Sequence, residues 1–176
     1  MKRDYTTLRE WRTDFDQGIP ILMYHKLASA PWRTKKYRFL YLSPRLFVRQ
    51  LKELRAASFE GIHLEKALEN NRIPARKIVI TFDDAFRSVF ENALEPLTNA
   101  KFQAIAYVVS ERIGAVNDWD QHLGDALQPL MSLSELKAWV SAGHEIGAHT
   151  QTHPNLTRIP ISAAREEISA SKKKLF

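Results

Sequence analysis

Short apolar runs alternate with amphipathic segments along most of the chain. Four runs have the length of strands, at residues 18–24, 78–82, 104–109 and 145–148. The run at 104–109 is apolar at almost every position, which is typical of a strand covered by helices on both faces of a sheet. Residues 62–64 add a brief fifth run. The pattern therefore predicts about five parallel strands.

The segments between these runs carry recognisable helix boundaries. Ser43-Pro44 is a favourable start, with serine as the cap and proline at the first helical position, and apolar residues recur at helical spacing up to Leu54. Further helices are predicted around residues 89–97, from Ser132 onwards and from Ser162 onwards. Strands that alternate with helices and end in polar residues are typical of an α/β barrel or a barrel-like sheet.

Two segments interrupt the alternation. Residues 1–18 mix charged and aromatic side chains, and we expect them to form an N-terminal extension to one domain that spans residues 19–176. A chain of 176 residues is long enough for one such domain with its own core. Residues 112–131 are too many for a plain connection, which predicts a substrate loop or a lid.

Two short polar motifs follow predicted strands. Asp83-Asp84 comes directly after the run at 78–82, and His149 and His153 come after the run at 145–148. One carboxylate and two imidazoles form a three-ligand set that leaves one position open on zinc, and the second carboxylate can serve as a base. Taken singly, each motif has a simpler interpretation, since an aspartate can cap the next helix and a histidine can pack in a core. Together they favour a metal site, because parallel strands bring their carboxyl ends to one edge of a sheet.

Composition narrows the chemistry further. The chain has no cysteine, so a metal must be held by histidine and carboxylate side chains. The net charge is +6, and part of the excess lies at residues 33–38 and 172–174. These cations could attract an anionic partner, but they do not form the basic stripe with interleaved aromatic residues that is typical of nucleic-acid binders, and we favour a solvated loop and a helix end. Residues 1–18 have no apolar signal region and no run is long enough for a membrane span, which predicts a cytoplasmic protein.

The same residues carry a resemblance to a known family. The chain resembles the polysaccharide deacetylases with a NodB-type domain, carbohydrate esterase family four, over nearly its whole length after Gly18. The resemblance lies in four segments, at residues 21–25, 81–84, 117–120 and 143–156. It implies a distorted (β/α)7-type barrel, here incomplete with about five strands, and a metal-dependent amidase that acts on N-acetylated sugars.

The resemblance also implies roles for individual residues. Asp84, His149 and His153 correspond to the ligands of Zn²⁺ or another divalent first-row metal, and Asp83 to the general base. These roles are chemically reasonable, because zinc lowers the pKa of water toward ~7 and polarises a carbonyl, and a free carboxylate can take the proton. Three residues are candidates for contact with the N-acetylated glycan: Tyr24, Trp119 and Asp120.

The chain departs from the family pattern in two respects. Ala85 stands where the first motif more often has glycine. More seriously, no residue matches the family's later Arg-x-Pro and Leu-x-His motifs, which supply an orienting arginine and the general-acid histidine. His25, at the exit of the first strand, is our candidate for a substitute acid, whereas His63 is expected to be structural.

These departures leave several functions open. We predict removal of N-acetyl groups from an amino sugar during cell-envelope polysaccharide or lipopolysaccharide biosynthesis. The alternative is a non-catalytic or incomplete subunit that binds or assembles glycans without the general acid. Three explanations fit the missing motifs: the chain is a fragment of a longer enzyme, a degenerate non-catalytic domain, or a domain completed by a homo-oligomer or another chain at its open edge. Phosphoesterase sites often hold two metals with more ligands than the sequence offers, so that class is not favoured.

Overall fold

One parallel sheet organises the molecule. The computed structural model describes residues 7–32, 37–69 and 76–176. Five strands form the sheet: β1 (Ile21–Tyr24), β4 (Glu60–Gly61), β5 (Lys77–Phe82), β6 (Ile105–Val108) and β7 (Glu145–Ala148). Every pairing among them is parallel, so the expected α/β class and the strand count are confirmed.

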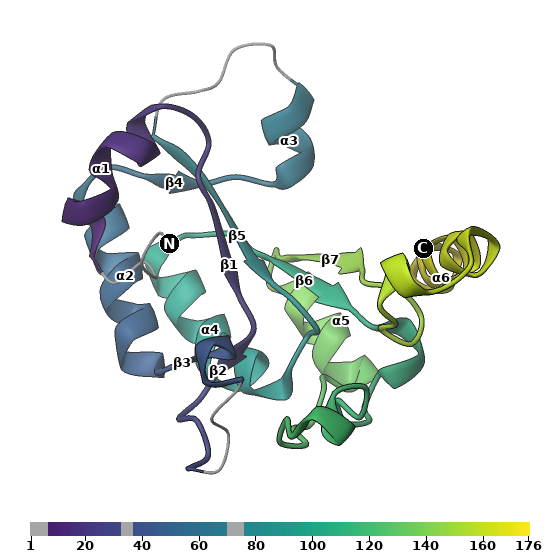
Figure 1. The fold of residues 1–176 in the computed structure, drawn as a ribbon. Helices are drawn as coiled ribbons and strands as arrows, with labels where there is room; N and C mark the ends of the chain where they lie inside the picture. Colours follow the sequence, from purple (N-terminus) through teal and green to yellow (C-terminus); the bar gives the residue numbers. More distant parts are fainter. Residues whose placement is uncertain (1–6, 33–36, 70–75) are drawn as a thin grey trace.

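The strand order brings the candidate residues to one edge of the sheet. The order is β1-β5-β6-β7, and β4 pairs with the first residues of β5. Tyr24 is aligned with Phe82, so His25 and Asp83 leave the sheet side by side, and His149 follows the last residue of β7. These carboxyl ends face the long loop between β6 and α5 (Figure 1).

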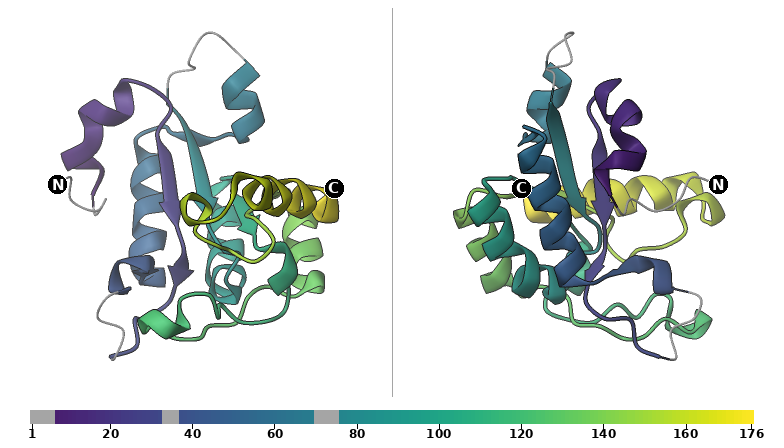
Figure 2. Two further views of the ribbon diagram at one scale, coloured as in Figure 1. Left: turned by 45° about the vertical axis from the view of Figure 1, so that its right-hand side comes forward. Right: turned by 90° about the vertical axis from the view of Figure 1, so that its left-hand side faces the viewer.

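Helices follow most of the strands. They are α1 (Leu8–Asp16), α2 (Pro44–Ala56), α3 (Leu64–Glu69), α4 (Arg87–Ala100), α5 (Leu133–Ser141) and α6 (Ile161–Leu175). Helices α2, α4 and α5 lie on the same side of the sheet, as Figure 2 shows. A separate two-stranded piece, β2 (Lys26–Leu27) with β3 (Tyr41–Leu42), continues the chain beyond β1. No helix in the described ranges is long and apolar enough to cross a membrane.

The core is packed around Phe82, the last residue of β5. Its ring is fully buried and lies within 6 Å of three other rings: 5.5 Å from Tyr24, 5.7 Å from Phe47 and 5.9 Å from Trp139. Aromatic contacts of this kind fix ring orientation as well as burying surface. The backbone that enters Asp83 is therefore held on a rigid element.

Predicted helix boundaries are confirmed for α2 and α5. The Ser43 hydroxyl accepts a hydrogen bond from the Leu46 N–H, and Pro44 is the first helical residue. Ser132 and Glu135 form a reciprocal capping box, in which each side chain satisfies a backbone N–H of the other residue. Gly143 follows the end of α5 with a φ of +89°, the conformation in which glycine is favoured.

Two predicted boundaries are wrong. The brief strand predicted at 62–64 lies earlier, at Glu60–Gly61, and Leu64 already begins α3. Residues 64–69 are mostly strong helix formers, which explains why the strand ends early. Helix α6 starts at Ile161 rather than after Ser162, because Pro160 occupies the cap position with a φ of −56° that already suits a helix start.

The segment before residue 19 contributes to the core. Within residues 7–18, α1 buries Leu8 and Phe15, and the Phe15 ring contacts the Phe59 ring edge-on at 5.8 Å. Residues 1–6 and the basic residues 33–36 predicted as loop lie outside the described residues. The N-terminal segment thus packs against the same core as the sheet.

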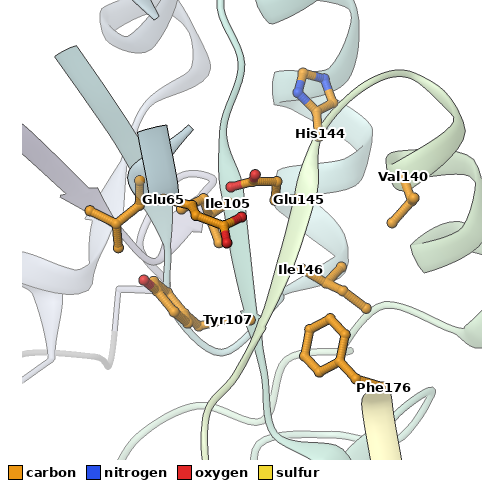
Figure 3. A pocket seen from close by; sticks show the side chains of 10 residues that line it. Glu65, Ile105, Tyr107, Val140, His144, Glu145, Ile146 and Phe176 are labelled. Carbon is orange, nitrogen blue, oxygen red and sulfur yellow. The ribbon is translucent and has the colours of Figure 1, made fainter. Parts of the chain in front are cut away.

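Strand β7 leaves one side of the sheet open within the described residues, where its hydrogen-bonded neighbour is β6 alone. An apolar hollow follows this edge, with Tyr107 on one side of the strand and Val140 and Phe176 on the other (Figure 3). Helix α5 buries Leu136 and Trp139, whereas two other apolar residues of this helix, Leu133 and Val140, remain about half exposed. The open edge therefore has apolar side chains along it.

Candidate metal centre

Asp83 and Asp84 lie where β5 ends, and neither caps the helix that follows. Phe86 occupies the cap position of α4, so the simpler interpretation of Asp84 as a helix cap is wrong. Asp84 and Ala85 have φ values of +69° and +52°. Left-handed backbone costs a residue with a side chain about 1–2 kcal/mol, which explains why glycine suits the position of Ala85. The turn directs the Asp84 carboxylate inward, where only 5% of the residue is exposed.

His149 and His153 lie on a tight loop after β7. Thr150 and His153 both have left-handed backbone, with φ values of +65° and +63°. The His153 N–H donates to the Thr150 hydroxyl at 3.0 Å, which closes the turn. Pro154 disfavours helical backbone at His153, and no helix runs through residues 149–153. The turn, and not helical spacing, brings the two imidazoles together. Their ring centres are 5.1 Å apart.

Asp84, His149 and His153 converge on one space. The Asp84 Oδ1 atom lies 3.4 Å from His149 Nε2 and 3.3 Å from His153 Nε2. One potential ligand atom from each residue lies within 4.8 Å of the others. Ligands about 2.1 Å from a tetrahedral zinc ion are separated by about 3.4 Å, so these spacings suit such an ion. Asp84 Oδ1 is also buried without a hydrogen-bond partner among the described residues, as expected of a ligand atom.

The charges of this set are shifted by their neighbours. Burial acts to raise the pKa of Asp84, but the two imidazoles outweigh it and hold that pKa below its usual value. Burial acts to lower the pKa of His149, but Asp84 and Asp83 outweigh it and raise it. Burial, reinforced by His149, lowers the pKa of His153. A divalent metal requires an ionised carboxylate and neutral imidazoles. The shifts at Asp84 and His153 favour that state, whereas the raised pKa of His149 favours its protonated form, so metal binding would release a proton there.

Asp83 lies beside the set with a different environment. Burial raises the pKa of its carboxyl group, and the nearby Asp84 adds to the effect, while His25 and His149 oppose it. His25 Nε2 is 3.8 Å from Asp83 Oδ2, and both side chains are partly accessible. The two residues that sequence analysis proposed for proton transfer are therefore neighbours at the mouth of the site.

The long loop contributes an aromatic wall. The Trp119 ring stacks on the His153 imidazole with centres 4.5 Å apart and planes inclined by 30°. Asp120 is near enough to act on His153: with Asp84 it tends to raise the pKa of the imidazole, but burial and His149 outweigh both and the pKa is lowered. Both residues lie at the site as predicted, and their contact with a glycan stays a prediction.

Tyr24 does not face the site. Successive residues of a strand point to opposite faces, and the Tyr24 side chain points into the core between Phe47 and Phe82. Its hydroxyl donates to the side-chain Oε1 atom of Gln50 at 3.0 Å. The prediction that Tyr24 contacts substrate is therefore wrong, because the strand register assigns its ring to packing. His63, expected to be structural, pairs with Glu145 at the opposite end of β7 from His149.

One residue that supports the loop of His149 and His153 was not predicted from the sequence. Glu167 of α6 accepts hydrogen bonds from the N–H groups of Gln151 and Thr152, at 2.7 and 2.9 Å, and from the Thr152 hydroxyl at 2.7 Å. Burial acts to raise the pKa of Glu167, but these hydrogen bonds outweigh it and hold that pKa below its usual value. A glutamate in an early helical turn has no sequence signal that distinguishes this role from a favourable position near the helix dipole.

Comparison with known proteins places this geometry in a family. Residues 70–175 match the family described as polysaccharide deacetylase, and no match was found among curated proteins. Among solved structures, the chain is similar to the Streptococcus pyogenes deacetylase PplD in complex with acetate. The identity is 26% and the TM-score 0.72, over 89% of this chain and 67% of that one.

Two further solved structures are similar to this chain. BC0361, a polysaccharide deacetylase from Bacillus cereus, is 28% identical with a TM-score of 0.70, over 92% of this chain and 47% of that one. IcaB from Ammonifex degensii is 20% identical with a TM-score of 0.72, over 90% of this chain and 68% of that one, which shows the shared fold. The chain thus spans about half to two thirds of the length of these structures.

Proposed function

The chain belongs to the polysaccharide deacetylase family, and from this we propose that it hydrolyses N-acetyl groups from an amino sugar of a polysaccharide or glycolipid. The observation that carries the proposal is the convergence of Asp84, His149 and His153 beside Asp83. A divalent cation held by the first three would supply Lewis acidity, which polarises an acetamide carbonyl and lowers the pKa of water toward ~7.

Asp83 is the proposed general base. Its carboxyl group is half-buried beside the three candidate ligands and is not needed to complete that set. Burial raises its pKa, which increases its affinity for the proton of an attacking water. Two adjacent aspartates can have separate roles because their environments shift their pKa values in opposite directions.

His25 is the proposed proton donor to the departing amine. It is the imidazole near Asp83 that lies outside the candidate ligand set, and it borders the same strand ends. A group that donates a proton in the transition state contributes roughly 10² to 10⁴ in rate. His25→Gln should therefore slow deacetylation while leaving the affinity for zinc unchanged.

Acetate release from an N-acetylhexosamine oligosaccharide by the zinc-loaded protein tests the proposal. Asp83→Asn should reduce the rate by roughly 10²-fold or more while one zinc ion per chain is still bound. His149→Ala should abolish zinc binding in calorimetric titration, because it removes one of three ligands. Asp118→Asn, which changes an exposed carboxylate of the long loop that pairs with Arg112, is the control and should leave both properties unchanged. Full activity in Asp83→Asn would contradict the role of the base.

The second candidate is a glycan-binding or assembly subunit that lacks the general acid. No residue of the 176 matches the family's Arg-x-Pro and Leu-x-His motifs, and the chain spans 47% of the Bacillus cereus structure, so the activity of these residues by themselves needs a direct test. Zinc content does not distinguish the two functions. Binding of an N-acetylated oligosaccharide without any acetate release, in the presence of zinc, would establish the second. A role in lipopolysaccharide biosynthesis and a cytoplasmic location stay predictions.

A further inference from the structure

A buried charge pair outside the metal centre has no role in the proposed chemistry. The Lys26 ammonium group, on β2, donates to Asp125 Oδ2 at 2.7 Å, and both side chains are almost completely buried. The Lys26 Nζ atom also lies 4.8 Å from the centre of the Tyr41 ring and 4.7 Å from that of Phe86. Taking two charges out of water is costly, so a pair in this position needs a structural or functional reason.

Asp125 joins Lys26 to the long loop at several points. The Asn117 amide donates to the same Asp125 Oδ2 at 2.8 Å, and the Asp125 Oδ1 atom accepts the Ala126 N–H at 2.9 Å. The Asp125 N–H donates to the Asp120 carbonyl at 3.2 Å. Asn117 is completely buried, so it holds the loop together and is not an exposed substrate contact.

These contacts flank the aromatic wall of the candidate site. Trp119 lies between Asn117 and Asp120, both of which bind Asp125, and its ring stacks on His153. The base of the loop is held separately, since the Met131 N–H donates to the Ala85 carbonyl at 2.8 Å. Lys26 therefore adds an attachment for the outer part of the loop, on the residue that directly follows His25.

We propose that Lys26, Asp125 and Asn117 form a positioning cluster that holds Trp119 against His153 and so shapes the sugar-binding wall of the candidate site. Lys26 acts on substrate through the loop and touches no reacting atom. The structural part of this inference depends only on the contacts above. Its consequence for a sugar rests on the proposed function.

The position of Trp119 can be followed in the zinc-free protein by ¹⁹F NMR after incorporation of 5-fluorotryptophan. Trp119→Phe identifies the resonance of Trp119 among those of the four tryptophans. Lys26→Met and Asp125→Asn should each shift or broaden that resonance, because the stack on His153 loosens. Exchange of the Ala126 amide hydrogen should accelerate at least tenfold in the same variants.

A double variant separates positioning from simple charge compensation. Lys26→Met leaves Asp125 buried and unpaired, which lowers the thermal midpoint, and adding Asp125→Asn should recover part of that loss. The Trp119 resonance should stay displaced in the double variant, since the contact from β2 to the loop is still absent. Lys77→Met, which breaks an exposed ion pair with Glu60, is the control and should leave the resonance unchanged.

A wild-type Trp119 resonance in folded Lys26→Met or Asp125→Asn would overturn the proposal, whatever the enzymatic activity. If Lys26→Met fails to fold, Asp125→Asn, which conserves the side-chain shape, decides the question. With an N-acetylated oligosaccharide, Lys26→Met should raise KM more than it lowers kcat. If the wild-type protein releases no acetate but the resonance still moves, the proposed function fails and the positioning cluster stands.

Discussion

Adjacent residues of the same type differ sharply in this molecule. Asp84 is buried and faces two imidazoles, which lower the pKa of its carboxyl group, whereas burial raises the pKa of Asp83. The difference arises because left-handed backbone at Asp84 turns its side chain away from the direction of Asp83. The different environments of these two residues therefore separate the candidate ligand, Asp84, from the proposed base, Asp83.

His144 provides a prediction at this scale. Burial, with a smaller effect from His63, lowers the pKa of its imidazole to about 4, and its ring packs on Trp139 at 4.3 Å. The unfolded chain binds a proton below pH ~6.5, while folded His144 does not until about pH 4, so stability is lost as the pH falls between these values. His144→Phe should remove about 2 kcal/mol of this loss at pH 5.

Chemical denaturation at pH 7.5 and pH 5 measures the effect of His144. The fall in the free energy of unfolding between the two pH values should be smaller in His144→Phe than in the wild type. His122→Phe, which changes an exposed histidine, should show the wild-type fall and serves as the control. An identical pH dependence in His144→Phe and the wild type would mean that the buried imidazole is not the cause.

At the scale of elements, two packed segments support the metal centre from outside. Helix α6 holds the loop of His149 and His153 through Glu167, and the long loop rests on His153 through Trp119. Neither contact supplies a ligand. Groups that orient ligands in this way change metal affinity because they determine how much reorganisation binding requires.

Glu167→Ala tests the support from α6. Removal of the carboxylate leaves the N–H groups of Gln151 and Thr152 without their acceptor, so the loop should become more mobile and zinc affinity should fall by about 10- to 100-fold. Calorimetric titration with zinc measures the change. Glu166→Ala, on the exposed side of the same helical turn, should bind zinc like the wild type. Equal affinities in both variants would rule out this role for Glu167.

At the scale of the whole molecule, the sheet presents an edge with apolar surroundings. Strand β7 has one paired neighbour in the described part of the chain, and Val140 and Phe176 are exposed in the hollow beside it. Unpaired strand edges with apolar side chains nearby favour association with another chain. The predicted association at this edge is tested for one partner, a second copy of this chain.

Sedimentation velocity over a range of protein concentrations tests association. The wild type should form larger species as the concentration rises, and Val140→Lys should reduce them, because a charge in the hollow must be desolvated on pairing. Ile161→Lys, an exposed apolar position at the start of α6, is the control and should associate like the wild type. A monomer at all concentrations would remove self-association, and association that Val140→Lys does not weaken would place it elsewhere.

Most of the secondary structure could be predicted from local patterns. The cap at Ser43, the capping-box helix after Ser132 and the strands β5, β6 and β7 follow from residue types within a few positions of each other. Errors occurred where a neighbour changed the outcome, as at Ser162, where Pro160 begins the helix earlier. The convergence of Asp84, His149 and His153 was also predicted, because parallel strands bring the residues that follow them to a common edge whatever the details of packing.

Tertiary packing decided what those patterns could not express. Three contacts join segments that are far apart in the chain and share no motif. They are those of Tyr24 with Gln50, of Glu167 with Gln151, and of Lys26 with Asp125. Their roles depend on which face of a strand is covered and on which loop reaches it, since an isolated lysine or glutamate has the same sequence signal in solvent and in a buried pair. The candidate ligands and base could thus be predicted from the sequence, whereas the residues that hold their loops in place were determined by the tertiary contacts.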